Sequence, residues 1–214
     1  MHLVFVRHGD PDYKNDSLTQ KGIKEAELLE KRVSEWKIDK VFCSPMGRAK
    51  LTSEIALKDR NITPEIKPWL REFNYPINDP DSKNKMAWDW LPRVYMGEDK
   101  YFDRSDWFNS KAMLSGDIGG HYKEVCNGID DILKEYGYKR KSEKDFLYTC
   151  TPHLTAEEAA IDTHLNQEQK DLDPKNLVFF CHLGVMFAII SHFTGVSPVQ
   201  LWQGFFVAPT SVTV

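Results

Sequence analysis

Short apolar segments that alternate with helical repeats constrain the fold of this chain more than any other feature. Residues 2–6, 39–45 and 176–182 are rich in β-branched and aromatic side chains, which is typical of buried strands. In residues 15–36 the apolar side chains recur every three or four positions, as they do along a helix, and the apolar residues 183–195 are typical of a buried helix that Gly195 ends. Strands that alternate with helices predict an α/β fold, with three α/β/α layers and a mostly parallel central sheet.

Polar residues indicate where two of these helices begin. Ser17 or Thr19 can cap the helix within residues 15–36. Ser44 is followed by a proline, a typical helix opening in which the hydroxyl caps the helix and the proline takes the first helical position. This start would place Arg48 in the first turn of the second helix.

A long irregular segment interrupts the alternation. From about residue 74 to 121 the periodicity gives way to Asp, Asn, Pro, Gly and aromatic residues, and loops of this size usually carry function. We expect one domain over 1–214, with a cap insertion at about 74–121 that covers the strand ends. Most of its aromatic side chains should form a small core of their own, and a minority should face a substrate. The other expected elements are helices over 122–137 and 155–169, a helical turn from Ser197, and a final strand over 205–214.

Composition and charge limit the classes of function. The 214 residues carry a formal net charge of −4, whereas a nucleic-acid-binding domain is normally basic, so we expect no nucleic-acid partner. No apolar stretch approaches the length of a membrane span, and the apolar start is too short for a signal peptide. The four cysteines form no C-x-x-C pair and are expected to be reduced thiols. These features predict a cytoplasmic protein without membrane contact.

Four polar residues stand at the ends of predicted strands. His8 follows the first strand, and His182 ends the strand at 176–182. Arg48 begins the helix after the second strand. Glu72 follows residues 63–70, which alternate like a third strand. Because ligands bind beyond the carboxyl ends of strands in open α/β sheets, we expect these four side chains to share one crevice.

The side chains expected there suit the transfer of a phosphoryl group. Arg7 and Arg48 carry planar guanidinium groups that bind phosphate oxygens at two points and stay charged at any working pH. The N-terminus of the Arg48 helix would add to this attraction. His8 can attack phosphorus only when its ring is neutral. Because arginines and histidines neutralise the phosphate, neither a metal nor a cofactor is needed.

Short motifs surround these residues. "RHGD", "SPMGRAK", "WLREF" and "FFCHLG" occur in this order, and "LTQKGIKEAE" follows the first of them. Together they resemble the histidine phosphatase superfamily, the fold shared with cofactor-dependent phosphoglycerate mutase. The resemblance covers residues 1–73 and 122–214 and leaves the middle of the chain unmatched. It implies a single histidine phosphatase-like domain.

The resemblance also implies a role for each motif residue. His8 would attack through Nε2, with its Nδ1–H held by a nearby backbone carbonyl. His182 would be the second imidazole that donates to the phosphoryl oxygens, and Arg7 and Arg48 would bind the same oxygens. Glu72 would protonate the leaving alkoxide and then accept a proton from the water that hydrolyses the phosphohistidine.

The assignment of the acid leaves alternatives open. The adjacent Arg71 could simply pair with Glu72. Asp10 and Asp12 are close to the nucleophile in sequence and could take the acid role instead.

Other positions match the family loosely. Members often have a phosphate-binding Asn shortly after the first motif; Asn15 is the candidate here, although Lys14 occupies the usual place. His121 could line the pocket or simply open a helix. Leu183 stands where a Gly often follows the second His, and the chain stops at Val214, so it is either a short member or lacks a tail.

Three functions are compatible with these residues. The first is a metal-independent phosphomonoesterase that acts through a phosphohistidine on a small phosphorylated substrate. The second is a mutase of the phosphoglycerate type, which returns the phosphoryl group to its substrate. The third is a binding module for phosphorylated ligands that has lost turnover. We favour the first, because the charges of the insertion cancel and its aromatic content suits a ring-bearing substrate better than a bisphosphate.

Overall fold

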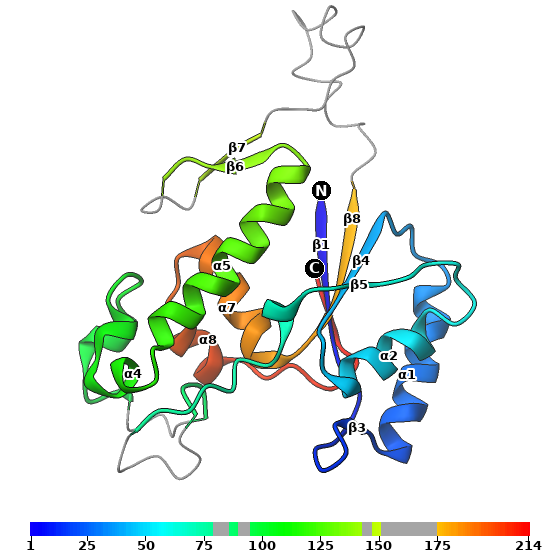
Figure 1. Ribbon diagram of the computed structural model, residues 1–214, viewed down its shortest axis with the longest axis horizontal. Helices are drawn as coiled ribbons and strands as arrows, with labels where there is room; N and C mark the ends of the chain where they lie inside the picture. The colour runs from blue at the N-terminus through cyan, green and yellow to red at the C-terminus, as the bar shows by residue number, and fades with distance from the viewer. Residues whose placement is uncertain (79–85, 90–94, 143–146, 151–174) are drawn as a thin grey trace, which may run out of the picture.

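A mostly parallel sheet organises the chain (Figure 1). The computed structural model describes residues 1–78, 86–89, 95–142, 147–150 and 175–214. Within these residues the main sheet has the order β5–β4–β8–β1–β9, formed by β1 (His2–Arg7), β4 (Lys40–Cys43), β5 (Glu65–Ile66), β8 (Asn176–Cys181) and β9 (Val212–Thr213). Neighbouring strands are parallel except β1 and β9. The predicted α/β fold with a mostly parallel central sheet is confirmed.

The register of the sheet brings three strand ends together. Arg7 at the end of β1 pairs with Cys181 at the end of β8. The backbone N–H of His8 donates to the carbonyl of Cys181 at 3.1 Å, and that of Ser44, after β4, donates to the carbonyl of Phe180 at 2.9 Å. The residues that follow β1, β4 and β8 therefore lie side by side at one edge of the sheet.

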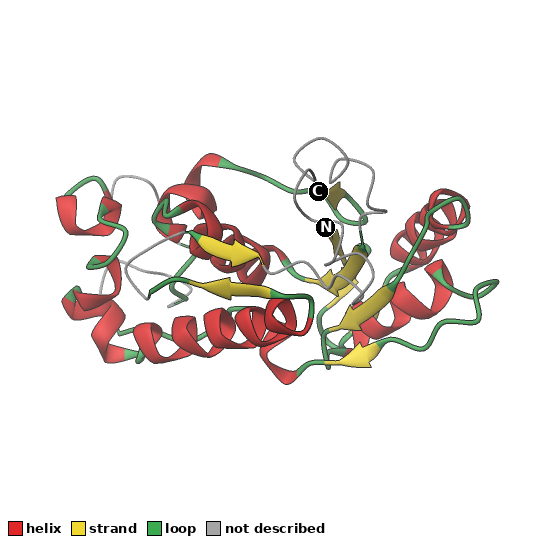
Figure 2. Cartoon of the chain, turned by 90° about the horizontal axis from the view of Figure 1, so that it is seen from above, coloured by secondary structure: helices red, strands yellow, loops and turns green. Residues whose placement is uncertain are grey.

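Helices cover both faces of the sheet, as Figure 2 shows. The longer ones are α1 (Gln20–Val33), α2 (Gly47–Ala56), α5 (Ile118–Glu135), α7 (Leu183–Thr194) and α8 (Pro198–Gly204). On one face α1 and α2 pack against Val178 and Phe180. On the other face α5, α7 and α8 share a core with the stacked rings of Phe5, Phe42 and Phe179. Successive side chains of a strand point to opposite faces of the sheet, which explains why the apolar residues of β8 contribute to both cores.

The two predicted helix caps differ in outcome. Thr19 caps α1 as predicted, with its hydroxyl accepting from the N–H of Gly22. The prediction that Ser44 caps the second helix is wrong, because α2 begins at Gly47 and Met46 is its N-cap residue. The Ser44 hydroxyl instead accepts from the Met46 N–H just before the helix, at 3.2 Å.

The strand predicted over residues 63–70 is shorter in the structure. Only β5 (Glu65–Ile66) pairs with β4, and a short 3-10 helix, η1 (Pro68–Leu70), follows it. Pro68 has no N–H to donate to a strand ladder and its ring fixes φ, so the strand ends before it. The final strand is also shorter than predicted, because Thr210 adopts a left-handed conformation (φ 56°) just before β9.

The described part of the 74–121 insertion is compact. It contains η2 (Asp99–Phe102), η3 (Trp107–Asn109) and α4 (Lys111–Ser115), and α5 begins at Ile118, four residues earlier than predicted. Tyr95, Tyr101 and Trp107 are buried. They do not form the separate core that we predicted: the Trp107 ring lies 5.7 Å from Trp202 of α8 and 5.2 Å from Tyr122 of α5, so these aromatics extend the main core.

Smaller elements complete the chain. In the described ranges two antiparallel strand pairs lie outside the main sheet: β2 (Pro11–Asp12) with β3 (Ser17–Leu18), and β6 (Tyr138–Arg140) with β7 (Tyr148–Cys150). The helix predicted over 155–169 lies outside the described residues. Among the helices that the structure describes, none has the length and apolar character needed to cross a membrane.

Candidate active site

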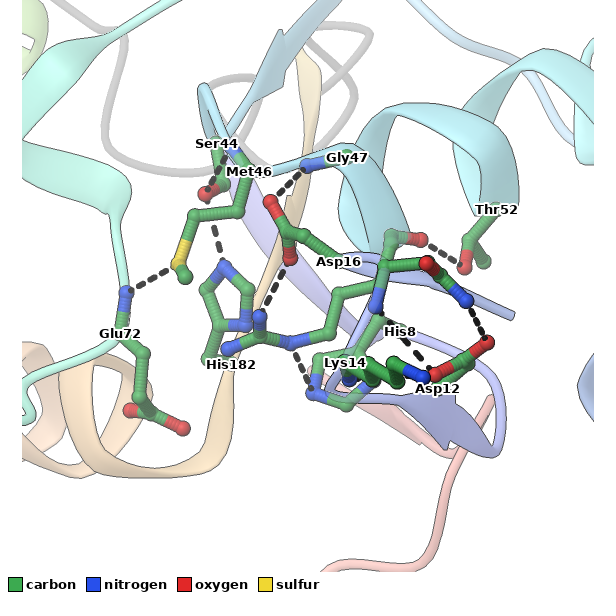
Figure 3. Close-up of polar contacts among 12 residues, drawn as sticks. His8, Asp12, Lys14, Asp16, Ser44, Met46, Gly47, Thr52, Glu72 and His182 are labelled. Atoms are coloured by element: carbon green, nitrogen blue, oxygen red, sulfur yellow. Dashed lines mark hydrogen bonds and ion pairs between the residues drawn. The ribbon is translucent and has the colours of Figure 1, made fainter. Parts of the chain in front are cut away.

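His8 lies buried directly after β1, and Figure 3 shows it near His182. Its Nδ1 lies 2.7 Å from the carbonyl oxygen of Gly9. A carbonyl oxygen can only accept, so Nδ1 carries the proton and Nε2 keeps its lone pair. The Nε of Arg48 donates to this Nε2 at 3.3 Å. Burial, assisted by the charges of Arg48 and Arg7, lowers the pKa of His8 to about 4, so the ring is neutral at pH 7.

His182 faces His8 from the end of β8. The two ring centroids lie 5.0 Å apart, and His182 is fully buried. Its Nε2 lies 2.7 Å from the hydroxyl of Ser44. Burial, together with the nearby His8 and the two arginines, lowers the pKa of His182 well below its ordinary value, so this ring is neutral too.

The hydroxyl of Ser44 determines which nitrogen of His182 carries the proton. Ser44 already accepts from the Met46 N–H, and among the described residues its hydroxyl hydrogen has no acceptor other than His182 Nε2. Ser44 therefore donates to Nε2, which places the proton of the neutral ring on Nδ1. Within the described part of the chain this buried Nδ1 has no hydrogen-bond partner. It is a donor without an acceptor, as expected where a ligand oxygen binds.

Arg48 is buried in the first turn of α2 and is held by an acidic side chain that the sequence analysis did not select. Asp16 accepts from the Arg48 guanidinium at 2.6 Å and from the N–H of Gly47 at 2.7 Å. Its carboxylate thus binds both the guanidinium and the N-terminus of α2, where a phosphate would also be attracted. Asp16 itself has a left-handed backbone conformation, with a φ of 47°.

Arg7 is the second arginine whose charge acts on His8. Its guanidinium donates to the carbonyl of Val207, in the segment before β9. Its Nε is buried and has no hydrogen-bond partner in the described ranges. Arg7 and Arg48 each lower the pKa of His8, which shows that both positive charges act on the same ring.

Glu72 is buried beside the start of α7. Its Oε1 accepts from the N–H groups of Phe73 and Gly184, both at 2.9 Å. A Cβ at position 184 would lie 2.6 Å from this oxygen, so only glycine leaves room for the carboxyl group. Burial raises the pKa of Glu72, and the positive charges of Arg48 and Arg7 oppose that rise. A carboxyl group with a raised pKa is suited to donating a proton near neutral pH.

Four of these side chains, those of Arg7, His8, Arg48 and Glu72, lie in a part of the chain that matches a known family. Residues 3–92 match the sequence profile of the histidine phosphatase superfamily (branch 1). Residues 3–92 belong to this superfamily. The resemblance seen in the sequence is confirmed.

The fold of the chain agrees with that of a solved phosphatase structure. The crystal structure of the alpha-ribazole phosphatase from Shigella flexneri matches 99% of this chain and 88% of its own, with a TM-score of 0.58 and 21% identity. At this identity the match establishes the fold alone.

Curated relatives match shorter parts of the chain. The adenosylcobalamin/alpha-ribazole phosphatase of Salmonella typhimurium is 28% identical over 114 residues, which are 44% of this chain and 56% of the relative. The arginine–tRNA ligase of Anaplasma phagocytophilum is 27% identical over 124 residues, which are 53% of this chain and 21% of the ligase. The chain thus spans about a fifth to just over half of these relatives.

The two aspartates that were the alternatives for the acid role form hydrogen bonds elsewhere. Asp10 accepts from the Thr19 hydroxyl at 2.6 Å, and Asp12 accepts from the side chain of Asn15 at 2.7 Å. These hydrogen bonds lower the pKa of each aspartate, which keeps it ionised and unable to donate a proton. Among the described residues Arg71 forms no ion pair with Glu72.

Two further predicted positions lie apart from the cluster. Asn15 is exposed on the turn between β2 and β3, where its side chain bonds Asp12 and none of the four motif side chains. His121 lies in α5 and stacks on Tyr75, with ring centroids 3.5 Å apart and planes 5° apart. The structure therefore brings together His8, His182, Arg7 and Arg48, with Glu72 alongside.

Proposed function

We propose that this protein is a metal-independent phosphomonoesterase that acts on a small phosphorylated substrate through a phosphohistidine on His8. The observation that carries the proposal is the orientation of His8: Nδ1 donates to a backbone carbonyl, so the lone pair of Nε2 points toward Arg48. The superfamily of residues 3–92 and the names of the relatives support phosphoryl chemistry. We further propose that the chain is one domain and that the insertion is its cap.

The side chains of the candidate site supply the groups needed for the first step, the transfer of the phosphoryl group to His8. The phosphoryl oxygens bind the guanidinium groups of Arg7 and Arg48 and the free Nδ1–H of His182, which spreads the negative charge of the transition state. The Nε2 lone pair of His8 forms a bond to phosphorus while the ester P–O bond breaks. Glu72 donates its proton to the leaving alkoxide.

The second step returns the enzyme to its starting state. Glu72, now a carboxylate, accepts a proton from a water molecule that attacks phosphorus. The P–N bond to His8 breaks, inorganic phosphate leaves, and Nε2 regains its lone pair. Each acid–base group thus finishes in the protonation state in which it began.

Trp88, a described residue of the insertion, lies near this machinery. The indole of Trp88 lies 3.1 Å from the position of a Cβ at residue 184, and the Glu72 carboxyl lies 2.6 Å from the same point. Trp88 and the Glu72 carboxyl group therefore both lie beside Gly184. This position of Trp88 supports a cap role for the segment at about 74–121.

The proposal predicts hydrolysis in preference to isomerisation, with no metal requirement. In the presence of a chelator the protein should release phosphate from p-nitrophenyl phosphate at an unchanged rate. With 3-phosphoglycerate and catalytic 2,3-bisphosphoglycerate, free phosphate should appear faster than 2-phosphoglycerate. Isomerisation that outpaces phosphate release would make the protein a mutase, and activity lost in chelator would refute the metal-independent mechanism.

Ser44 provides a second test, because it orients His182 without touching the substrate. In Ser44→Ala the tautomer of His182 is no longer determined, and we expect kcat/KM to fall about fivefold, the worth of one hydrogen bond of about 1 kcal/mol. The ¹⁵N NMR shifts of His182 should show Nδ1–H in the parent protein and a tautomer mixture in the variant. The control is Ser53→Ala, which also removes a buried hydroxyl, one that lies on α2 and bonds the carbonyl of Lys50. Equal effects of both variants would reduce Ser44 to a packing role.

A further inference from the structure

Two exposed aromatic rings stand beside the arginines of the site. Tyr13 is 71% exposed, and its ring centroid lies 5.5 Å from the guanidinium carbon of Arg48. Phe206 is 79% exposed, and its ring centroid lies 5.7 Å from the guanidinium carbon of Arg7. The two rings come from opposite ends of the chain. Each one accompanies a different arginine that acts on His8.

Neither ring is explained by the packing of the fold. Both side chains are more exposed than any other aromatic residue in the described part of the chain. Single exposed apolar residues are common, but these two recur at the same small site. Phe102, which is 40% exposed, has no guanidinium over its ring among the residues described.

We propose that Tyr13 and Phe206 bind the leaving group of a phosphomonoester that carries a flat aromatic ring close to the ester oxygen. This inference rests on the proposed phosphatase function and specifies its substrate class. Once the arginines hold the phosphoryl oxygens, a planar group one to three bonds from the ester oxygen comes within reach of rings that lie less than 6 Å from the guanidinium carbons. Stacked and edge-on contacts between aromatic rings then favour a flat leaving group.

The sequence analysis placed the substrate-facing aromatic residues in the insertion, whereas Tyr13 and Phe206 lie outside it. Tyr95, Tyr101 and Trp107 of the insertion are buried in the main core and present no free ring face. Tyr13 lies on the turn after β2, and Phe206 follows α8. An alternative role for both rings is to cover the guanidinium groups and strengthen their hold on phosphate. That role would act on all phosphate esters equally.

The test compares two substrates that differ only in the flatness of the ring. Benzyl phosphate and cyclohexylmethyl phosphate have leaving groups of similar size, and both leave as primary alkoxides. The unmodified protein should prefer the benzyl ester in kcat/KM. Tyr13→Leu and Phe206→Leu should each reduce this preference by about two- to tenfold, the range expected for one aromatic pair. Phe102→Leu, the matched control, should leave the preference unchanged.

Each outcome has a distinct meaning. A loss of preference in both leucine variants, with the control unchanged, supports the inference. Equal rates for the two esters in the unmodified protein, or equal losses on both esters in the variants, overturn it while phosphatase activity persists. If neither ester nor p-nitrophenyl phosphate is hydrolysed, or if hydrolysis survives in His8→Ala, the proposed function itself fails.

Discussion

Replacing His8 with alanine is expected to lower phosphatase activity by at least about a thousandfold, because the variant has no nucleophile to accept the phosphoryl group. The structure supports so large an effect for two reasons. The ring is neutral at pH 7, since its pKa is lowered to about 4, and Nε2 carries the free lone pair. The remaining arginines can still bind phosphate, so the variant should retain affinity for phosphate while it loses turnover.

Two measurements check this expectation. The first is the rate of phosphate release from p-nitrophenyl phosphate, with His2→Ala as the control because His2 lies on the same strand and is exposed. The second is a rapid quench with labelled substrate, which should trap an adduct on His8 that is labile in acid and stable in base, as phosphoramidates are. An adduct that survives acid, or activity that survives in His8→Ala, would assign the attack to another group.

Much of the candidate site at the edge of the sheet can be predicted from local sequence patterns. The apolar runs of β1 and β8 are buried on both faces, so a polar residue directly after either run must lie at the edge of the sheet. His8 and His182 follow these runs, and parallel pairing in register brings them face to face. Arg48 is placed by the start of a helix, which is also a local signal, although the helix begins at Gly47 and not at Ser44.

The rest of the site depends on contacts between segments far apart in the sequence. Asp16 binds Arg48 across 32 positions, and nothing near Asp16 in the sequence indicates this partner. Ser44 offered a local helix cap, but its hydroxyl instead donates to His182, which is 138 positions away. Phe206 reaches Arg7 only because the segment before β9 crosses the end of β1. The partner of each of these side chains is determined by tertiary packing, which local propensity does not encode.

The exchange of Glu72 for glutamine is expected to have the second largest effect, and its size should depend on the leaving group. An amide cannot donate the proton that an alkoxide needs, so kcat/KM for an alkyl phosphate should fall by about a hundredfold or more. The p-nitrophenolate ion leaves without protonation, so p-nitrophenyl phosphate should lose much less. The glutamine carbonyl oxygen can still accept from the N–H groups of Phe73 and Gly184, so the variant should fold normally.

The same variant separates the two roles of Glu72, because kcat/KM reports only the steps up to release of the first product. Glu72 must also accept a proton from water in the second step, so the phosphohistidine should persist in Glu72→Gln. With p-nitrophenyl phosphate, a rapid burst of p-nitrophenolate of about one equivalent per enzyme should therefore precede a slow steady rate. The matched control is Asp12→Asn, since Asp12 is ionised, hydrogen-bonded to Asn15 and expected to be a bystander. A loss of kcat/KM that is equal for both esters, or a burst that appears in Asp12→Asn instead, would transfer the acid–base role away from Glu72.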